Sequence, residues 1–165
     1  MKNTTYKHTI RSVIVDAILV TLALILSYVE RMLPIGLLIP IPGIKLGLAN
    51  IVTIFALFYL GIKSALIISI LRCVIASMLF GGVYSFLFSL SGALISLFLM
   101  SILMGGYNKY FSIFGISIGG AAAHNIGQVI IATVMLQSTA VLPYLSLLLF
   151  SSLITGTLTG YISGK

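Results

Sequence analysis

Residues 84–104 read YSFLFSLSGALISLFLMSILM and contain no charged side chain. A membrane-spanning helix needs about 20 consecutive apolar residues, and this stretch has that length. The whole chain has the same character, because 60% of its 165 residues are hydrophobic and only 7% are charged. Soluble domains carry about 25% charged residues, which cover the surface that faces water. The composition therefore excludes a soluble enzyme and a disordered chain, and it predicts a membrane protein.

Similar apolar runs along the chain predict an all-α bundle of six transmembrane helices. We expect these helices at about 12–33, 46–60, 63–80, 84–104, 116–136 and 142–163. Pro34 ends the first helix, and Gly-Gly pairs at 81–82 and 105–106 end the third and the fourth. Residues 1–165 are expected to form a single integral membrane domain.

The basic residues predict how this bundle is oriented, because Lys and Arg are favoured on the cytoplasmic side of a membrane. With six crossings, one side receives Lys2, Lys7, Arg11, Lys63, Lys109 and Lys165. The other side receives only Arg31 and Lys45. This asymmetry predicts a multi-pass protein with both termini in the cytoplasm (N-in, C-in).

The charged residues also exclude several functions. The nine basic residues are dispersed singly, so we do not expect nucleic-acid binding. The two acids, Asp16 and Glu30, lie far apart, so the chain has no carboxylate cluster that could hold Mg²⁺ against a diphosphate. It also lacks the GxxxxGK[ST] loop of ATPases. The single cysteine, Cys73, is expected to be a packing residue. We therefore predict no enzyme activity, no catalytic residue, no cofactor and no metal site in this chain.

Arg72 is the most informative polar residue. It lies about nine residues into the third expected helix, which is near the middle of the membrane. A charge there costs about 2.5–3.5 kcal/mol on insertion scales, so it normally faces the bundle interior and has a partner. Two interpretations remain open: a structural ion pair, for which Glu30 is the better placed acid, or a cation that binds an anionic substrate.

A second group of polar residues falls near the middle of the fifth expected helix. His124 and Gln128 are four residues apart and share a helix face, and Asn125 lies three residues before Gln128. Amide and imidazole groups in hydrocarbon must find hydrogen-bond partners. They could bind a polar ligand or simply link helices. Together with Arg72 they predict a shared polar cavity.

A third group is the segment PGIKLGLAN at residues 42–50. Its proline and first glycine predict a turn, and Gly47 allows a close approach of the backbone. Lys45 is expected near the outer mouth of the bundle, where it could hold an anion, and Asn50 points into the membrane about one turn later. The alternative is an interfacial lysine whose stem lies along the apolar surface.

Small residues recur every four positions on several expected helices. They are Ser85, Ser89 and Ala93; Gly115, Gly119, Ala123 and Gly127; and Gly156, Gly160 and Gly164. Such rows let membrane helices pack closely, and we interpret them mainly as contacts within the bundle. The first helix carries two shorter pairs, Ala17/Thr21 and Ala23/Ser27, which could pack within the bundle or against a partner.

Several of these segments occur together in one bacterial membrane family. They are Glu30 with Pro34, PGIKLGLAN at 42–50, Arg72, FLFSLSG at 86–92, AHNIGQ at 123–128 and ITGTLTG at 154–160. Through them the chain resembles the Gx transporter family, also labelled heptaprenyl diphosphate synthase component I. That family is similar to the substrate-binding membrane subunits of energy-coupling factor importers. Those subunits have six helices and no ATPase, and they dock on a transmembrane coupling subunit with two ATPases.

The resemblance implies a substrate-capture subunit for a small, partly polar ligand in the bacterial cytoplasmic membrane. It implies a ligand pocket in the outer half of the bundle, closed by loops such as 35–45. The predicted binding residues are Arg72, Asn125, Gln128, His124, Glu30, Lys45 and Asn50, with Glu30 orienting Arg72. The resemblance also implies that small residues of the first helix touch the coupling subunit.

Two alternatives to the importer subunit remain open. The first is a non-catalytic subunit associated with heptaprenyl diphosphate synthase, in keeping with the family's other label. The second is a facilitator or small channel that works alone.

Overall fold

The structure is a computed structural model that describes residues 2–33, 45 and 47–163. Its helices are α1 (Lys2–Met32), α2 (Asn50–Tyr59), α3 (Ile62–Ala76), the π-helical turn η2 (Ser77–Gly81), α4 (Gly82–Met104), α5 (Ile113–Leu136), the 3₁₀ turn η3 (Thr139–Val141) and α6 (Pro143–Ser163). No β-strand occurs in these residues, so the all-α prediction is confirmed. The turn expected at Pro42 and Gly43 lies outside the described residues.

Four stretches are long and apolar enough to span a membrane: Ile10–Met32, Ile62–Met104, Ile113–Leu136 and Thr139–Ser163. The second predicted span corresponds to α2, which has only 10 residues. At about 1.5 Å per residue it covers about half of the hydrocarbon core. The third predicted span, α3, falls in one continuous stretch with α4. The structure therefore does not support six membrane-spanning helices, and it does not support the N-in, C-in orientation.

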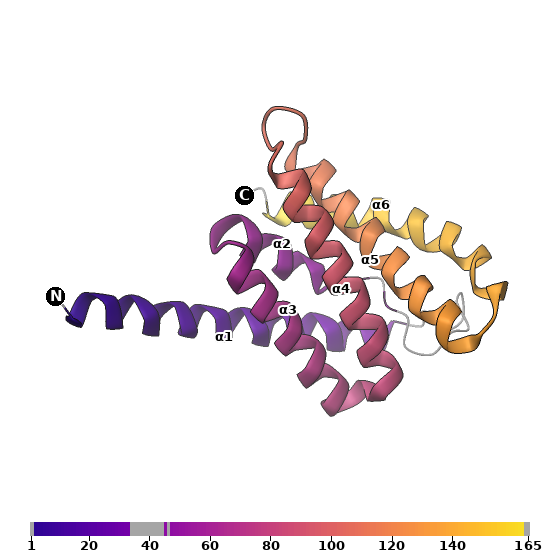
Figure 1. Cartoon of the computed structure of the whole chain (residues 1–165), viewed down its shortest axis with the longest axis horizontal. Coiled ribbons are helices and arrows are strands. Elements are labelled where there is room, and N and C mark those ends of the chain that lie inside the picture. The colour runs from indigo at the N-terminus through magenta and orange to yellow at the C-terminus, as the bar shows by residue number, and fades with distance from the viewer. Residues whose placement is uncertain (1, 34–44, 46, 164–165) are drawn as a thin grey trace.

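The first helix is longer than its apolar run. It begins at Lys2, about ten residues before the expected start, because no proline or glycine interrupts residues 2–32. Its N-terminal part extends beyond the rest of the bundle (Figure 1). Ala23 and Ser27 are buried inside the protein, whereas Ala17 and Thr21 are exposed. The pair Ala23/Ser27 therefore packs within the bundle, and only the pair Ala17/Thr21 remains available to a partner.

The long apolar stretch folds back on itself where α4 begins. Gly82 has a φ of 71°, in the region that glycine adopts without steric cost. As the Gly-Gly pair predicts, the chain reverses here, and α3 and α4 lie side by side in opposite directions (Figure 1).

The helices α4, α5 and α6 pack closely through their small residues. α5 lies between the other two (Figure 1). A Cβ atom added at Gly127 of α5 would lie 2.9 Å from Cα of Gly92 of α4. One added at Gly156 of α6 would lie 2.6 Å from Cα of Ile118 of α5. These contacts confirm packing within the bundle for Gly127 and Gly156, whereas Gly164 lies outside the described residues.

Candidate functional site

Polar side chains gather where α1, α3, α4 and α5 meet the segment before α2. We call them the polar cluster, and its members are Glu30, Lys45, Arg72, Ser89, His124, Asn125 and Gln128. All except Lys45 are at most 3% exposed, and Lys45 is partly buried. Polar groups buried in a membrane bundle need internal partners, so the hydrogen bonds of each member indicate its role.

Gln128 of α5 binds the backbone of Lys45 through both ends of its amide. The Lys45 N–H donates to Gln128 Oε1 at 2.7 Å, and Gln128 Nε2 donates to the Lys45 carbonyl oxygen at 2.7 Å. The same Nε2 also donates to Asn125 Oδ1 at 3.2 Å. Asn125 Nδ2 in turn donates to the carbonyl oxygen of Leu148 in α6 at 2.8 Å. Gln128 and Asn125 were both predicted to bind the ligand, but in the structure their amides form hydrogen bonds with the protein's own backbone.

The ammonium group of Lys45 turns inward to α4. Its Nζ donates to Ser89 Oγ at 3.0 Å. Burial lowers the pKa of Lys45 below its ordinary value, the charge of Arg72 lowers it further, and the charge of Glu30 partly opposes both. Lys45 is thus a cation in contact with the cluster rather than one directed away from the bundle. Ser89 was not predicted as a site residue, because its place in a small-residue row indicated packing alone.

Glu30, at the end of α1, anchors the segment before α2. Its Oε1 accepts a hydrogen bond from the N–H of Gly47 at 2.5 Å. Gly47 has a φ of 88°, and a Cβ atom there would lie 3.1 Å from Cδ2 of His124. Glycine is required here by both the backbone conformation and the close approach of the imidazole ring.

Two members of the polar cluster have buried side-chain nitrogens without a hydrogen-bond partner in the described part of the chain: Arg72 of α3, at Nε and Nη2, and His124 of α5, at Nδ1. The Nε and Nη2 atoms of Arg72 are buried, and neither has a hydrogen-bond partner among the described residues, Glu30 included. A buried donor without an acceptor costs about 1–3 kcal/mol, and a charged one costs more. Arg72 is therefore the charged group of the cluster with two buried donors that lack an acceptor in the described part of the chain.

His124 and Asn50 both contact neighbouring helices: His124 packs against glycines, and Asn50 forms hydrogen bonds with Ser96. The ring of His124 lies between two glycines, since a Cβ atom at Gly92 would be only 2.8 Å from its Nδ1 and Cε1 atoms. Asn50, at the start of α2, donates from Nδ2 to Ser96 Oγ at 3.0 Å, and Ser96 Oγ lies 3.3 Å from Asn50 Oδ1. Asn50 thus joins α2 to α4 and makes no hydrogen bond to the described members of the polar cluster. Ser96 was also not predicted.

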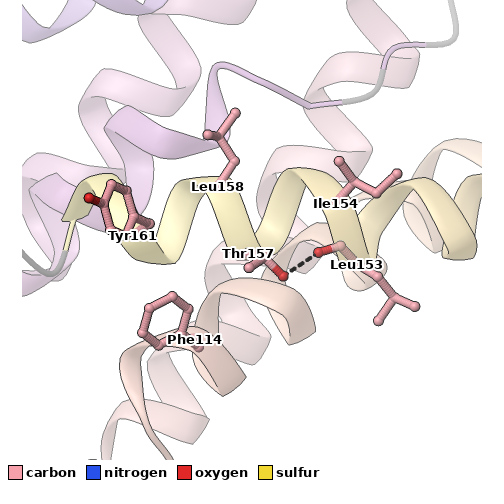
Figure 2. A pocket seen from close by; sticks show the side chains of 6 residues that line it. All are labelled: Phe114, Leu153, Ile154, Thr157, Leu158 and Tyr161. Atoms are coloured by element: carbon pink, nitrogen blue, oxygen red, sulfur yellow. Dashed lines mark hydrogen bonds between the residues drawn. The ribbon is translucent and has the colours of Figure 1, made fainter.

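A surface groove of about 570 Å³ lies elsewhere on the protein, between α5 and α6 (Figure 2). It is lined by Phe114, Leu153, Ile154, Thr157, Leu158 and Tyr161. The Thr157 hydroxyl, its small polar group, donates to the carbonyl oxygen of Leu153 (Figure 2). The groove contains none of the predicted site residues, and its lining suits hydrocarbon rather than a polar group.

Comparison with known proteins gives one match. The model of the family described as heptaprenyl diphosphate synthase component I matches residues 19–165. The match covers the segments 42–50 and 123–128, and it confirms the resemblance found in the sequence. No curated protein matches the chain, and no solved structure does.

Proposed function

This chain belongs to the heptaprenyl diphosphate synthase component I family, and from that premise we propose that it captures a small, partly polar ligand as a membrane subunit of an importer of the energy-coupling factor type. The observation that supports this proposal is the polar cluster. It holds a buried guanidinium group with two unused donors, Nε and Nη2 of Arg72. A purely structural arginine would use these donors within the protein.

The family is a non-catalytic component, so the chain is not itself an enzyme. The work of transport is then done by partner ATPases, and this subunit supplies recognition. In our proposal Arg72 contacts the polar part of the ligand, and Lys45 provides a second positive charge at the same place. Gln128, Asn125 and Glu30 hold Lys45 and the segment that follows it in position.

The remaining predicted residues receive supporting roles in this proposal. His124 fills the space between Gly47 and Gly92, and Asn50 fixes α2 against α4. Direct contact with the ligand is therefore assigned to the two cations, and the uncharged members of the cluster position them.

We further propose that the bundle is one membrane domain with six crossings and both termini in the cytoplasm of a bacterium. Two observations support this arrangement. The reversal at Gly82 divides the stretch Ile62–Met104 into two antiparallel helices, which raises the four long apolar stretches to five helices, and the proposal assigns the sixth crossing to the short α2. Six of the basic residues then fall on one side of the membrane, as the positive-inside rule requires.

A partner subunit is proposed to dock on the exposed face of α1. Ala17 and Thr21 lie on this face, and small residues allow close helix contacts. Purification from native membranes in a mild detergent is expected to recover a coupling subunit and two ATPases. Ala17→Leu is expected to reduce that recovery, whereas Ala140→Leu, at an exposed alanine of η3, leaves it unchanged. Absence of the coupling subunit with the unmodified protein would contradict the proposal.

The family's description favours a second candidate, an accessory subunit of a prenyl diphosphate synthase. The chain would then associate with another synthase component without catalysing the reaction itself. Addition of the purified protein in lipid nanodiscs to the synthase is expected to change the rate or the chain length of the product. An unchanged rate and product would eliminate this candidate.

A further inference from the structure

We propose that the Nε–Nη2 edge of Arg72 is a bidentate seat for an oxoanion, so that the captured ligand carries a carboxylate or a phosphate monoester. This inference rests on the proposed capture function and names the chemical class of the ligand. It concerns only the guanidinium group and the charges around it. The apolar part of the ligand is left open.

The geometry of the guanidinium group supports a bidentate contact. The Nε–H bond and one Nη2–H bond lie on the same edge of the planar group and point in nearly the same direction. Both atoms are buried and lack an acceptor among the described residues. This pair of parallel donors matches two oxygen atoms of one carboxylate or phosphate. A ligand with a single hydroxyl or amide oxygen would satisfy such an edge less completely.

The surrounding charges favour an anion with one negative charge. Arg72 and Lys45 are the cations of the polar cluster, and Glu30 is its one acid. Glu30 Oε1 already accepts from Gly47, and the chain's other acid, Asp16, accepts through Oδ2 from Ser64 Oγ at 3.3 Å. The cluster therefore holds one more positive than negative charge when Lys45 is protonated. With Glu30 ionised, an incoming carboxylate balances that charge, a phosphate monoester, with about two negative charges at pH 7, exceeds it, and a cationic ligand would be repelled.

The effect of Arg72 on the pKa of Lys45 also favours the binding of an anion. The positive charge of Arg72 lowers the pKa of Lys45, and burial lowers it more. A negative charge placed on Arg72 would oppose the influence of Arg72 on its neighbour. The anion would thereby favour the protonated form of Lys45, which strengthens the attraction of both residues for it.

The closing experiment observes Arg72 directly in the unmodified protein. The chain has three arginines, Arg11, Arg31 and Arg72. Protein labelled with ¹⁵N-arginine and embedded in nanodiscs gives their Nε–H resonances, which Arg72→Lys and Arg31→Lys assign. The probes are octanoate, octyl phosphate, octanamide and octylamine, which share one alkyl chain and differ in the head group. We expect octanoate or octyl phosphate to shift the Arg72 resonance, and octanamide and octylamine to leave it unchanged.

Affinity measurements on the same probes test the bidentate contact. Arg72→Lys keeps the charge but loses the planar edge, and we expect it to weaken oxoanion binding at least about tenfold. Arg72→Gln is expected to abolish binding. Arg31→Lys, at an exposed position near the ring of Phe80, is the matched control and is expected to bind normally. The tighter of the two oxoanions identifies carboxylate or phosphate as the natural head group.

Two outcomes would overturn the inference: no shift of the Arg72 resonance with either oxoanion, or equal binding of octanamide. The proposed function fails differently. If the coupling subunit is recovered and the bound ligand proves neutral, capture stands and the oxoanion seat is wrong. If oxoanions bind at Arg72 and no coupling subunit is recovered, the proposed oxoanion site is correct and the importer assignment is wrong.

Discussion

The two ends of the polar cluster are equally buried but differ in how their donors are used. At the amide end, Gln128 and Asn125 are 0% exposed, and their amides bind the backbone of Lys45 and of Leu148. At the cation end, Arg72 is 3% exposed, yet two of its nitrogens have no acceptor in the described part of the chain. Burial alone therefore does not identify a binding residue in this protein. The proposed binding role of Arg72 rests instead on its unused charged donors, and the predictions below test this difference between the two ends.

The largest effect is expected at the amide end, from Gln128→Ala. This change leaves the N–H and the carbonyl oxygen of Lys45 without their partner, and each buried unpaired group costs about 1–3 kcal/mol. We expect a loss of about 3 kcal/mol in the free energy of unfolding, measured by SDS titration in mixed micelles.

Gln137→Ala provides the matched control, because Gln137 is the exposed residue that caps the same helix. Its effect is expected to stay within about 0.5 kcal/mol. A Gln128→Ala protein as stable as this control would show that the amide end does not serve to fasten the segment before α2.

A smaller loss is expected from Gly92→Ala, which tests the packing beside the amide end. The new Cβ atom would lie 2.8 Å from the ring and from the backbone oxygen of His124. Overpacking of this kind costs about 1–3 kcal/mol, and the same titration measures it. Gly115→Ala is the control, because the Cβ atom added at Gly115 would lie 3.7 Å from its nearest neighbour, Ser112 Oγ, which is an ordinary van der Waals distance. Equal stability of the two variants would contradict the close contact between α4 and α5.

Arg72→Met is expected to stabilise the ligand-free protein by about 1 kcal/mol or more, because it removes buried charged donors that lack an acceptor. The Nε and Nη2 atoms have no partner among the described residues that the change would leave unpaired. The thermal unfolding temperature in detergent measures this effect. A loss as large as that of Gln128→Ala would show that Arg72 has a structural role, and the distinction between the two ends would fail.

The smallest effect concerns the pH dependence of Lys45. Burial and Arg72 lower its pKa, so between the lowered pKa and the ordinary one the folded protein binds fewer protons than the unfolded chain. Stability from this residue is therefore greatest above the ordinary pKa and is lost as the pH falls through the lowered one. We expect Lys45→Met to gain stability relative to the unmodified protein between pH 10 and pH 7. Thermal unfolding at both pH values measures the difference, and a constant difference would contradict the prediction.

The fold was largely predictable from the apolar runs, and its exceptions have simple reasons. The Gly-Gly pair at 81–82 predicted the reversal between α3 and α4, because glycine accepts a positive φ. The polar residues before Ile10 gave no apolar signal, so the N-terminal extension of α1 was missed. The shortness of α2 was missed because Leu46–Ala49 are as apolar as the helix that they precede.

The burial of most members of the polar cluster was predictable, whereas their contacts were not. Positions near the middle of apolar helices indicated that Arg72, Asn125 and Gln128 are buried. The pairing of Gln128 with Lys45 joins residues 83 apart in the sequence, and no local pattern specifies such a contact. Ser89 and Ser96 were missed for another reason, because a serine in a helix row looks the same whether it packs or donates.

The reversal at Gly82 also matters for biosynthesis. A straight helix over the 43 residues from Ile62 to Met104 would be about 64 Å long, roughly twice the thickness of the hydrocarbon core. The insertion machinery must therefore receive α3 and α4 together as a helical hairpin. The charged Arg72 then enters the lipid with α4 alongside it, before α5 and α6 have been made.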